Sequence, residues 1–267
     1  MPESWSTLIN GLSLAFYVAA LALSFLHGGL RRTRIAPWII GCLAAGFLGH
    51  TVEVTTSWAS SGTIPATTLR ELCGAQAWIL VFLYLILFVR LRNTILAFFL
   101  TPIVTVSYLL YMLLPVTHLE PKAYFYTPWF VFHILTLLFG MSLFLLSFLY
   151  AMIYIVQDNR LRRQLPPPRL PLPPVERASR WASRLLLWGY PLFTVGILSS
   201  IVYGVRYGTG RDWHPGLMEG ASILAWLVLG LAVWGWFSAK VGPRKRSWLI
   251  VAGACFTVLI LIGILWH

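Results

Sequence analysis

Long apolar stretches separated by short polar connections dominate the hydropathy pattern of this 267-residue chain. A helix needs roughly 20 apolar residues to cross about 30 Å of hydrocarbon at 1.5 Å per residue. By that criterion the pattern predicts eight spans, at about residues 7–27, 36–57, 70–90, 94–115, 128–156, 185–206, 217–238 and 247–266. We therefore expect an all-α polytopic membrane protein, a bundle of eight transmembrane helices that forms a single domain over residues 1–267.

The polar connections alternate sharply in charge. Those on one side of the predicted membrane hold sixteen of the 20 Lys and Arg residues, and those on the other side hold four. The positive-inside rule makes the basic side cytoplasmic and places both termini outside. Orientation therefore accounts for the net charge of +12, and we expect no nucleic-acid partner. The longest cytoplasmic connection, at about residues 158–184, contains "QLPPPRLPLPPVERASR" and is predicted to be an extended proline-rich spacer.

The composition narrows the class of protein further. It is 58% hydrophobic and 10% charged, with a mean hydropathy of +0.78, which excludes an ordinary soluble domain. Its 3 cysteines form no CxxCH motif, so the chain is not itself a c-type cytochrome. HExxH, Walker and GxSxG motifs are absent from the sequence, which argues against hydrolytic or phosphoryl-transfer chemistry.

Two histidines interrupt predicted spans near the expected outer face. His50, in "FLGHTVEVTTSW", lies about seven residues or roughly 10 Å below the outer end of its span. His133, in "PWFVFHILTLLFG", lies about five residues or roughly 8 Å below the outer end of another. Imidazoles at matched depth on two facing helices suit the axial ligands of a b-type haem. A hydrogen bond to a neighbouring helix is the alternative interpretation for either histidine.

Glu53 follows His50 by one helical turn, so both side chains leave the same face. Three partners fit its carboxylate: the His50 imidazole, Arg70 in the next connection, or a cationic group of a bound ligand. Arg70 and Glu71 also fit an ordinary interfacial salt bridge, and Glu71 suits the N-terminus of a helix.

The outer connection "RDWHPG" places Arg211, Trp213 and His214 side by side. Trp213 suits stacking on a porphyrin, Arg211 suits a propionate, and His214 suits transient ligation of iron. Arg70 and Arg206 are further candidate propionate partners. An interfacial tryptophan in a Pro/Gly turn is the alternative interpretation of this loop.

The order of several motifs resembles a known family. They are "GHTVEV", "LRELCGAQAWILVFLYL", "FHILTLLFGMSLFLLSFLYAMIYIVQDNRLR", "LLLWGYPLFTVGILSSIVYG" and "ASILAWLVLGLAVWG", which together cover most of the chain. In this order they resemble the CcsA/HemX group of haem-handling membrane proteins, within the wider cytochrome c assembly family that includes CcmC and CcmF.

The resemblance implies several expectations about function. In that family a Trp-rich outer loop before the penultimate span presents haem, and outward histidines flank it. By position, His133 matches an outward histidine, His50 matches the histidine of an early "HT" motif, and Trp213 with Pro215 matches part of the loop element. We therefore expect haem b near the periplasmic face of a bacterial inner membrane. Haem, lipid, and other assembly proteins or apocytochrome c are the expected partners.

Departures from the family pattern narrow this expectation. The loop has a single tryptophan and carries His214 where the family usually has Asp, and Trp234 stands where catalytic members often carry a histidine. The sequence also ends at His267, before a segment with a second outward histidine. We therefore expect an accessory, HemX-like member rather than a complete haem lyase. A haem b or quinone-binding subunit of a respiratory complex, or a regulator of haem biosynthesis acting through the proline-rich segment, are the alternatives.

Overall fold

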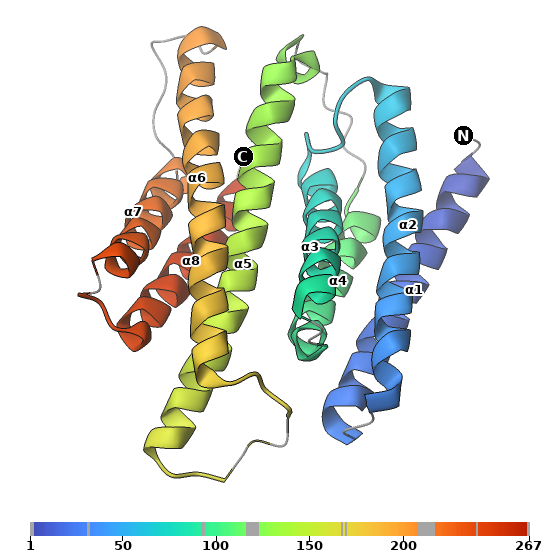
Figure 1. The fold of residues 1–267 in the computed structure, drawn as a ribbon. Coiled ribbons are helices and arrows are strands. Elements are labelled where there is room, and N and C mark those ends of the chain that lie inside the picture. The colour runs from blue at the N-terminus through green and yellow to red at the C-terminus, as the bar shows by residue number, and fades with distance from the viewer. Residues whose placement is uncertain are drawn as a thin grey trace. The chain divides into compact units, whose positions relative to one another are not determined.

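The computed structural model describes residues 3–30, 33–91, 94–115, 123–166, 168, 170–207, 217–238 and 240–265. Within these ranges the chain is helical and contains no strand, which confirms the all-α prediction (Figure 1). The long helices are α1 (Glu3–Leu30), α2 (Ala36–Ser61), α3 (Leu69–Leu91), α4 (Ile95–Leu113), α5 (Pro128–Arg162), α6 (Val175–Tyr207), α7 (Leu217–Phe237) and α8 (Pro243–Leu265). Two short 3-10 helices, η1 (Thr33–Ile35) and η2 (Ala123–Tyr126), precede α2 and α5.

Seven of these helices, α1 to α7, are long and apolar enough to cross a membrane within the described residues. The protein is therefore a multi-pass membrane protein, as predicted. Helix α8 coincides with the eighth predicted span, and its side chains are described as far as Thr257. The total of eight spans and the outward position of both termini stay predictions.

Helices α5 and α6 are longer than the sequence pattern predicted. They contain 35 and 33 residues, which corresponds to about 50 Å each. The connection between them is therefore residues 163–174 rather than 158–184, because both helices continue beyond the apolar run into arginine-rich turns. Polar side chains of α5 hold the ends of this connection: Gln157 donates to the Pro173 carbonyl, and Arg160 donates to the Pro166 carbonyl at 2.5 Å.

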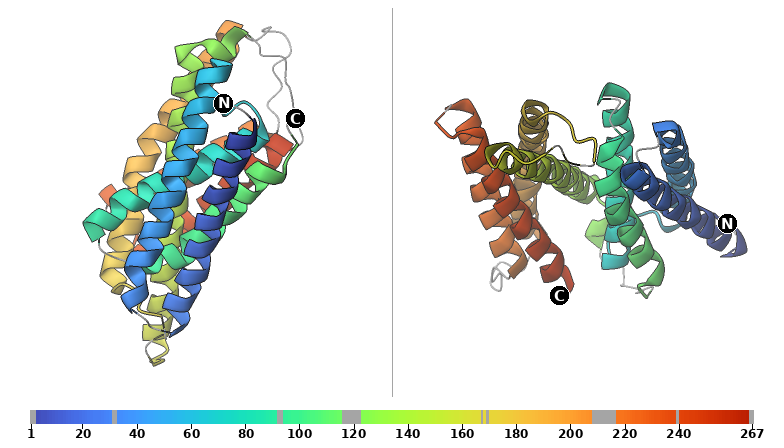
Figure 2. Two further views of the ribbon diagram at one scale, coloured as in Figure 1. Left: turned by 90° about the vertical axis from the view of Figure 1, so that its right-hand side faces the viewer. Right: turned by 90° about the horizontal axis from the view of Figure 1, so that it is seen from below.

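The chain divides into two compact units of four helices each. Unit 1 comprises residues 1–126 with 168–172, and unit 2 comprises residues 127–167 with 173–267. In unit 1, α1 packs on α2 and α4, and α3 packs on α2 and α4; in unit 2, α5 packs on α6 and α8, and α7 packs on α6 and α8. The two units thus share one order of helix packing, and the helices of each can be followed in Figure 2. The prediction of a single domain stays open.

A polar seam joins α1 to α4 inside unit 1. The α1 side consists of buried residues spaced alternately by three and four positions: Asn10, Ser13, Tyr17, Ala20, Ser24 and His27. Hydrogen bonds cross from this row to α4 or its cap along its length. Tyr108 donates to Asn10 at 3.1 Å, and Thr105 donates to the Tyr17 carbonyl at 3.4 Å. Ser24 bonds Thr101 at 2.8 Å, and His27 bonds Thr94 at 3.0 Å. Hydrogen bonds between helices add to close packing in lipid, where apolar burial between helices gives little driving force.

A tryptophan joins the second and third helices of unit 1. The indole N–H of Trp78 on α3 donates to the Thr51 hydroxyl on α2 at 2.8 Å. The Thr51 hydroxyl in turn donates to the Phe47 carbonyl at 2.7 Å. The Trp78 ring stacks on the Phe47 ring, with centroids 5.3 Å apart. The Thr51 hydroxyl therefore accepts the hydrogen bond of the indole N–H and donates its own proton to a carbonyl of α2.

Unit 2 repeats this arrangement between its second and third helices. Trp226 on α7 donates to the Thr194 hydroxyl on α6 at 2.9 Å, and Thr194 donates to the Tyr190 carbonyl at 2.7 Å. The Trp226 and Tyr190 rings stack with centroids 6.0 Å apart. In both units the aromatic residue precedes the threonine by four positions, so the side chains share one helical face.

The sequences around the two tryptophans align once these contacts are matched. "GFLGHTV" in α2 corresponds to "GYPLFTV" in α6, and "LRELCGAQAWILV" in α3 corresponds to "LMEGASILAWLVL" in α7. Helices α3 and α7 both begin at the leucine that opens their segment, Leu69 and Leu217. The two units therefore contain a repeated structural motif, which hydropathy alone did not reveal.

Because α1 and α2 approach closely at Gly46, a methyl group added there should lower stability, whereas one added elsewhere on α2 should not. A Cβ atom at Gly46 would lie 2.8 Å from the Tyr17 ring, which has no exposed surface and no room to move. We expect Gly46→Ala to lower stability by about 1–3 kcal/mol through overpacking. Gly41 lies on the same helix, and a Cβ atom added there would meet nothing within 4 Å, so Gly41→Ala should be neutral or slightly stabilising. Denaturant unfolding in detergent measures both, and equal stability of the two variants would contradict the packing.

Because the tryptophan–threonine contact is repeated, removing it should lower the stability of the protein by a similar amount in either unit. Thr51→Val and Thr194→Val each remove the acceptor of an indole N–H, and we expect each to cost about 0.6–2 kcal/mol. Thr55 is the control because its hydroxyl is exposed and bonds only to carbonyls of its own helix. Thr55→Val should change stability by less than about 0.5 kcal/mol. The same unfolding assay compares the three variants, and a loss confined to one unit would speak against a shared motif.

Candidate functional site

His50 lies in the interior of unit 1, inside a ring of tyrosines. Its side chain has no exposed surface. The rings of Tyr108, Tyr17 and Tyr111 surround it, with centroids 4.6, 6.2 and 6.2 Å from the imidazole. These tyrosines come from α1 and α4, so the packing of three helices determines the position of His50.

The two nitrogens of His50 differ in their contacts. Nδ1 lies 3.3 Å from the Tyr17 hydroxyl. Nε2 is enclosed and has no hydrogen-bond partner among the described residues. A buried polar atom without a partner costs about 1–3 kcal/mol, so nearly all such atoms in proteins are paired. Nε2 therefore suits a ligand that the chain does not supply, although the tyrosine rings would have to move before a ligand could reach it.

The repeat gives an independent view of this position. The position in unit 2 equivalent to His50 is Phe193, because each directly precedes the threonine that accepts from the indole. The Phe193 side chain is 1% exposed. Its ring contacts Phe144 of α5 edge-on, with centroids 5.2 Å apart, as His50 contacts Tyr17 of α1. Packing at this position is therefore satisfied by a plain aromatic ring, and the imidazole nitrogens of His50 add chemistry that the fold does not need.

Glu53 pairs with a residue that the sequence did not indicate. The Tyr111 hydroxyl donates to the Glu53 carboxylate in a short hydrogen bond. Arg70 donates to the Leu114 carbonyl at 2.9 Å and places its guanidinium 5.0 Å from the centre of the Tyr111 ring. Among the described residues no ion pair joins Glu53 to Arg70, and no hydrogen bond joins Glu53 to His50. Tyr111 thus lies between the two charged groups.

Glu71 closes the first turn of α3 rather than pairing with Arg70. Its carboxylate accepts hydrogen bonds from the Thr67 amide and hydroxyl and from the Thr68 amide, at 2.8, 2.7 and 3.2 Å. The Glu71 amide donates back to the Thr68 hydroxyl at 3.2 Å. This reciprocal pattern is a capping box, which confirms the predicted role of Glu71 at a helix N-terminus.

His133 on α5 is held by α6 within unit 2. Its Nδ1 lies 3.0 Å from the Gly196 carbonyl oxygen and 2.9 Å from the Ser199 hydroxyl. Because a carbonyl only accepts, Nδ1 carries the proton in this geometry, and a neutral imidazole then has its lone pair on Nε2. Metal-binding histidines typically show this arrangement, with the distal nitrogen hydrogen-bonded to a carbonyl. The half-buried His133 side chain therefore fits the chemistry of an iron ligand.

The other predicted site residues divide by location. Arg211, Trp213 and His214 lie outside the described residues, and Arg206 belongs to α6 with its side chain outside the described part. His50 belongs to unit 1 and His133 to unit 2, so their joint ligation of one iron stays a prediction. No group of three or more His, Cys, Asp or Glu side chains suited to a metal ion occurs among the described residues.

Sequence reasoning missed the tyrosines around His50 and the residues that hold His133. A signal existed for Tyr108 and Tyr111, since two hydroxyl-bearing rings one turn apart in an apolar helix require polar partners. Tyr17 also falls in the regular row of polar positions along α1. Ser199 offered no comparable signal, because serine is a common packing residue in membrane helices.

Comparison with known proteins gives a consistent classification. The family model of the cytochrome c assembly protein matches residues 66–267. The chain is 26% identical to protein HemX of Brevibacillus brevis over 253 residues, which covers 91% of this chain and 90% of that relative. These matches concern the same region in which the motifs resembled the family.

A solved structure matches the fold. The cytochrome c haem lyase CcmF superposes with a TM-score of 0.73 at 14% sequence identity, over 97% of this chain. The chain spans 46% of the length of that lyase, about half, and the likeness concerns the fold alone. Since the family model covers well over half of the sequence, this chain belongs to the cytochrome c assembly protein family.

Proposed function

We propose that this protein handles haem during cytochrome c biogenesis, as an accessory protein of the bacterial inner membrane. Haem b would bind near the periplasmic face, and other assembly proteins or apocytochrome c would be its protein partners. The observation that carries the proposal is the geometry of His133, whose Nδ1 faces the Gly196 carbonyl at 3.0 Å and so leaves Nε2 available. Membership of the cytochrome c assembly family supports the choice of haem over other ligands of imidazole.

His133 would ligate haem iron through Nε2. Gly196 and Ser199 position the ring, and the Trp129 indole donates to the Ser199 carbonyl at 3.4 Å, which holds the first turn of α5 against α6. Haem supplies an iron centre and a flat apolar surface when it is bound. The protein's part is to fix the tautomer and direction of the imidazole before the ligand arrives.

His50 would be a second ligand, enclosed in unit 1. Its unpaired Nε2 and the phenylalanine at the equivalent position in unit 2 support a role other than packing. With Nε2 bound, Nδ1 carries the ring proton, and the Tyr17 hydroxyl oxygen would accept it and hold the ring. Access requires the surrounding tyrosine rings to separate, so His50 would engage its ligand after a rearrangement of α1 and α4.

The remaining predicted contacts complete the proposal. Arg70 would leave the Leu114 carbonyl to meet a haem propionate, and Arg206 and Arg211 are further propionate partners. Trp213 and His214 would contact haem from the outer loop. Glu53, bonded to Tyr111, would set the charge around Arg70 rather than touch iron.

Titration of the purified protein with haem tests the two ligands separately. We expect His133→Ala to weaken haem binding at least tenfold, or about 1.4 kcal/mol, with a change in the Soret band. Ser199→Ala should weaken binding less, because the Gly196 carbonyl still fixes the tautomer. His50→Phe should keep the stability of the wild type while altering the spectrum of bound haem.

His27→Phe is the control, because it also replaces a buried histidine of unit 1 by a plain ring. His27 lies in the last turn of α1, where it bonds Thr94, and it is not one of the proposed haem ligands. This variant should leave the haem spectrum unchanged. Wild-type spectra and affinities in both the His133→Ala and His50→Phe proteins would show that neither histidine is a ligand. Unfolding of the His50→Phe protein would instead assign His50 to the stability of unit 1.

A further inference from the structure

The first turns of α6 carry a row of arginine and tryptophan side chains. Arg177, Trp181, Arg184 and Trp188 are spaced by four, three and four positions, so they follow one face of the helix. Both arginines are exposed, and Trp188 is 53% exposed. We call these residues, together with the exposed Arg180, the Arg–Trp row.

Contacts within the row order its side chains. The Arg184 guanidinium lies 5.4 Å from the centre of the Trp181 ring, and the Trp181 and Trp188 rings meet edge to face with centroids 6.1 Å apart. A cation–π contact of this kind restrains an exposed arginine side chain. The row therefore presents ordered cationic groups beside a flat aromatic surface.

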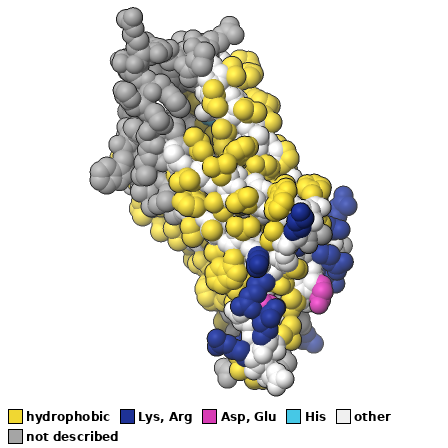
Figure 3. Space-filling model, turned by 90° about the vertical axis from the view of Figure 1, so that its left-hand side faces the viewer, with side chains coloured by type: hydrophobic (Ala, Val, Ile, Leu, Met, Phe, Trp, Pro, Cys, Tyr) yellow, Lys and Arg dark blue, Asp and Glu magenta, His cyan; other side chains and the backbone are white. Residues whose placement is uncertain are grey.

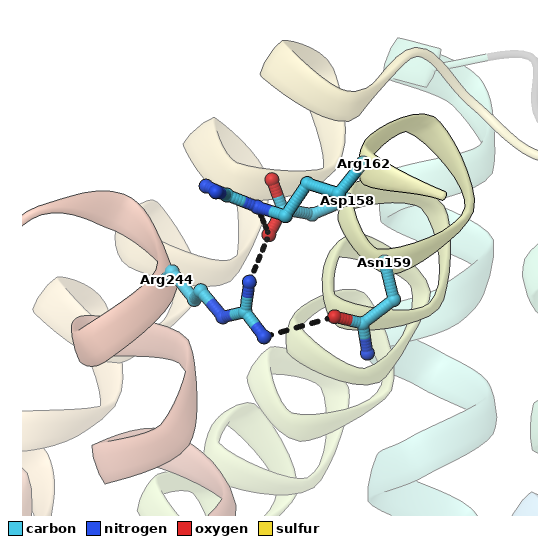
Figure 4. A network of polar contacts seen from close by, with 4 residues as sticks. All are labelled: Asp158, Asn159, Arg162 and Arg244. Atoms are coloured by element: carbon cyan, nitrogen blue, oxygen red, sulfur yellow. Dashed lines mark hydrogen bonds and ion pairs between the residues drawn. The ribbon is translucent and has the colours of Figure 1, made fainter. Parts of the chain in front are cut away.

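Two acidic residues lie near the row, Glu176 on α6 and Asp158 on α5. Glu176 stands one turn before Arg180 and makes no ion pair with an arginine of the row among the described residues. Asp158 of α5 is already engaged by Arg162 at 2.9 Å and by Arg244 at 3.4 Å, and Arg244 also donates to Asn159 at 3.0 Å (Figure 4). Within the described residues, the ion pairs are the two made by Asp158, and neither includes an arginine of the row. Lys and Arg side chains gather at this end of unit 2, directly beside hydrophobic surface (Figure 3).

The length of α6 places the row at a membrane boundary. Its 33 residues extend about 50 Å, whereas the hydrocarbon core measures about 30 Å. Roughly 20 Å of helix therefore lies beyond the hydrocarbon, and the arginines mark the end at which it lies. Tryptophan and arginine side chains are suited to the headgroup level, where each has an apolar part in lipid and a polar part in water.

We propose that the Arg–Trp row binds the phosphate of an anionic phospholipid headgroup. Guanidinium groups bind phosphate oxygens in pairs of parallel hydrogen bonds, and Arg180 and Arg184 lie one turn apart on α6 for this purpose. Trp181 and Trp188 would contact the glycerol and upper acyl chain of the same lipid. This site is independent of the haem proposal, because it uses no residue of either histidine site.

Native mass spectrometry of the whole protein released from vesicles of phosphatidylcholine and phosphatidylglycerol tests the site. Arg177→Gln/Arg180→Gln/Arg184→Gln should reduce retained phosphatidylglycerol at least tenfold, since it removes every guanidinium group that would pair with the phosphate. The matched control Arg163→Gln/Lys240→Gln/Lys245→Gln removes three exposed cationic charges from the same unit. Retention by the control should stay within twofold of the wild type.

A conservative variant separates specific binding from net charge. Replacing the same three arginines by lysine keeps the charge, so folding should be preserved, but removes the paired hydrogen bonds and should give an intermediate loss. Equal retention in the glutamine variant and the wild type, or equal losses in the glutamine variant and its control, would overturn the proposal. Binding of an acidic peptide without any effect on lipid retention would assign the row to a protein partner instead.

Discussion

Inside a bilayer, polar groups must find partners within the protein because no water is present to replace them. Much of this structure follows from that constraint. Asn10 and Ser24 of α1 bond to the Tyr108 and Thr101 side chains of α4. The half-buried indoles of Trp78 and Trp226 each donate to a threonine hydroxyl. The carboxyl group of Glu53 is paired with the Tyr111 hydroxyl. Against this background the Nε2 of His50 is one of the few enclosed polar atoms, with Ser13 Oγ and Ser238 Oγ, that have no hydrogen-bond partner in the described part of the chain. Such an atom has a measurable cost in stability.

The two units show how function is added to a repeated scaffold. Equivalent positions hold His50 and Phe193, and three residues later they hold Glu53 and Gly196. Unit 1 therefore has polar side chains where unit 2 has a plain ring and a glycine whose carbonyl orients His133. Since equivalent packing is achieved with and without these polar groups, packing alone does not require them, which agrees with the ligand role that we propose.

Much of the fold followed from the sequence. Predicted spans agree with α2, α3, α4 and α7 to within four residues at each end, because apolar length directly limits a membrane helix. The predicted C-terminal end of α5 and N-terminal end of α6 were wrong, because a helix can continue into water after its apolar run has ended. Individual side-chain contacts were harder to predict. Tyr111 is 58 residues from Glu53 in the sequence. Its proximity to Glu53 depends on how α4 packs, which periodicity alone does not reveal. The haem interpretation of His50 and His133 came from depth and resemblance, and the nitrogen that each leaves available became visible only in the structure.

The ligation of haem iron by two imidazoles, those of His133 and His50, is the central claim, and electron paramagnetic resonance of the ferric haem-loaded wild-type protein tests it most directly. Two histidine ligands favour a low-spin ferric iron, whereas one histidine with a weak sixth ligand leaves it high-spin. The account predicts a low-spin signal from haem that stays with the protein through gel filtration. A purely high-spin signal, or haem that separates from the protein, would contradict it.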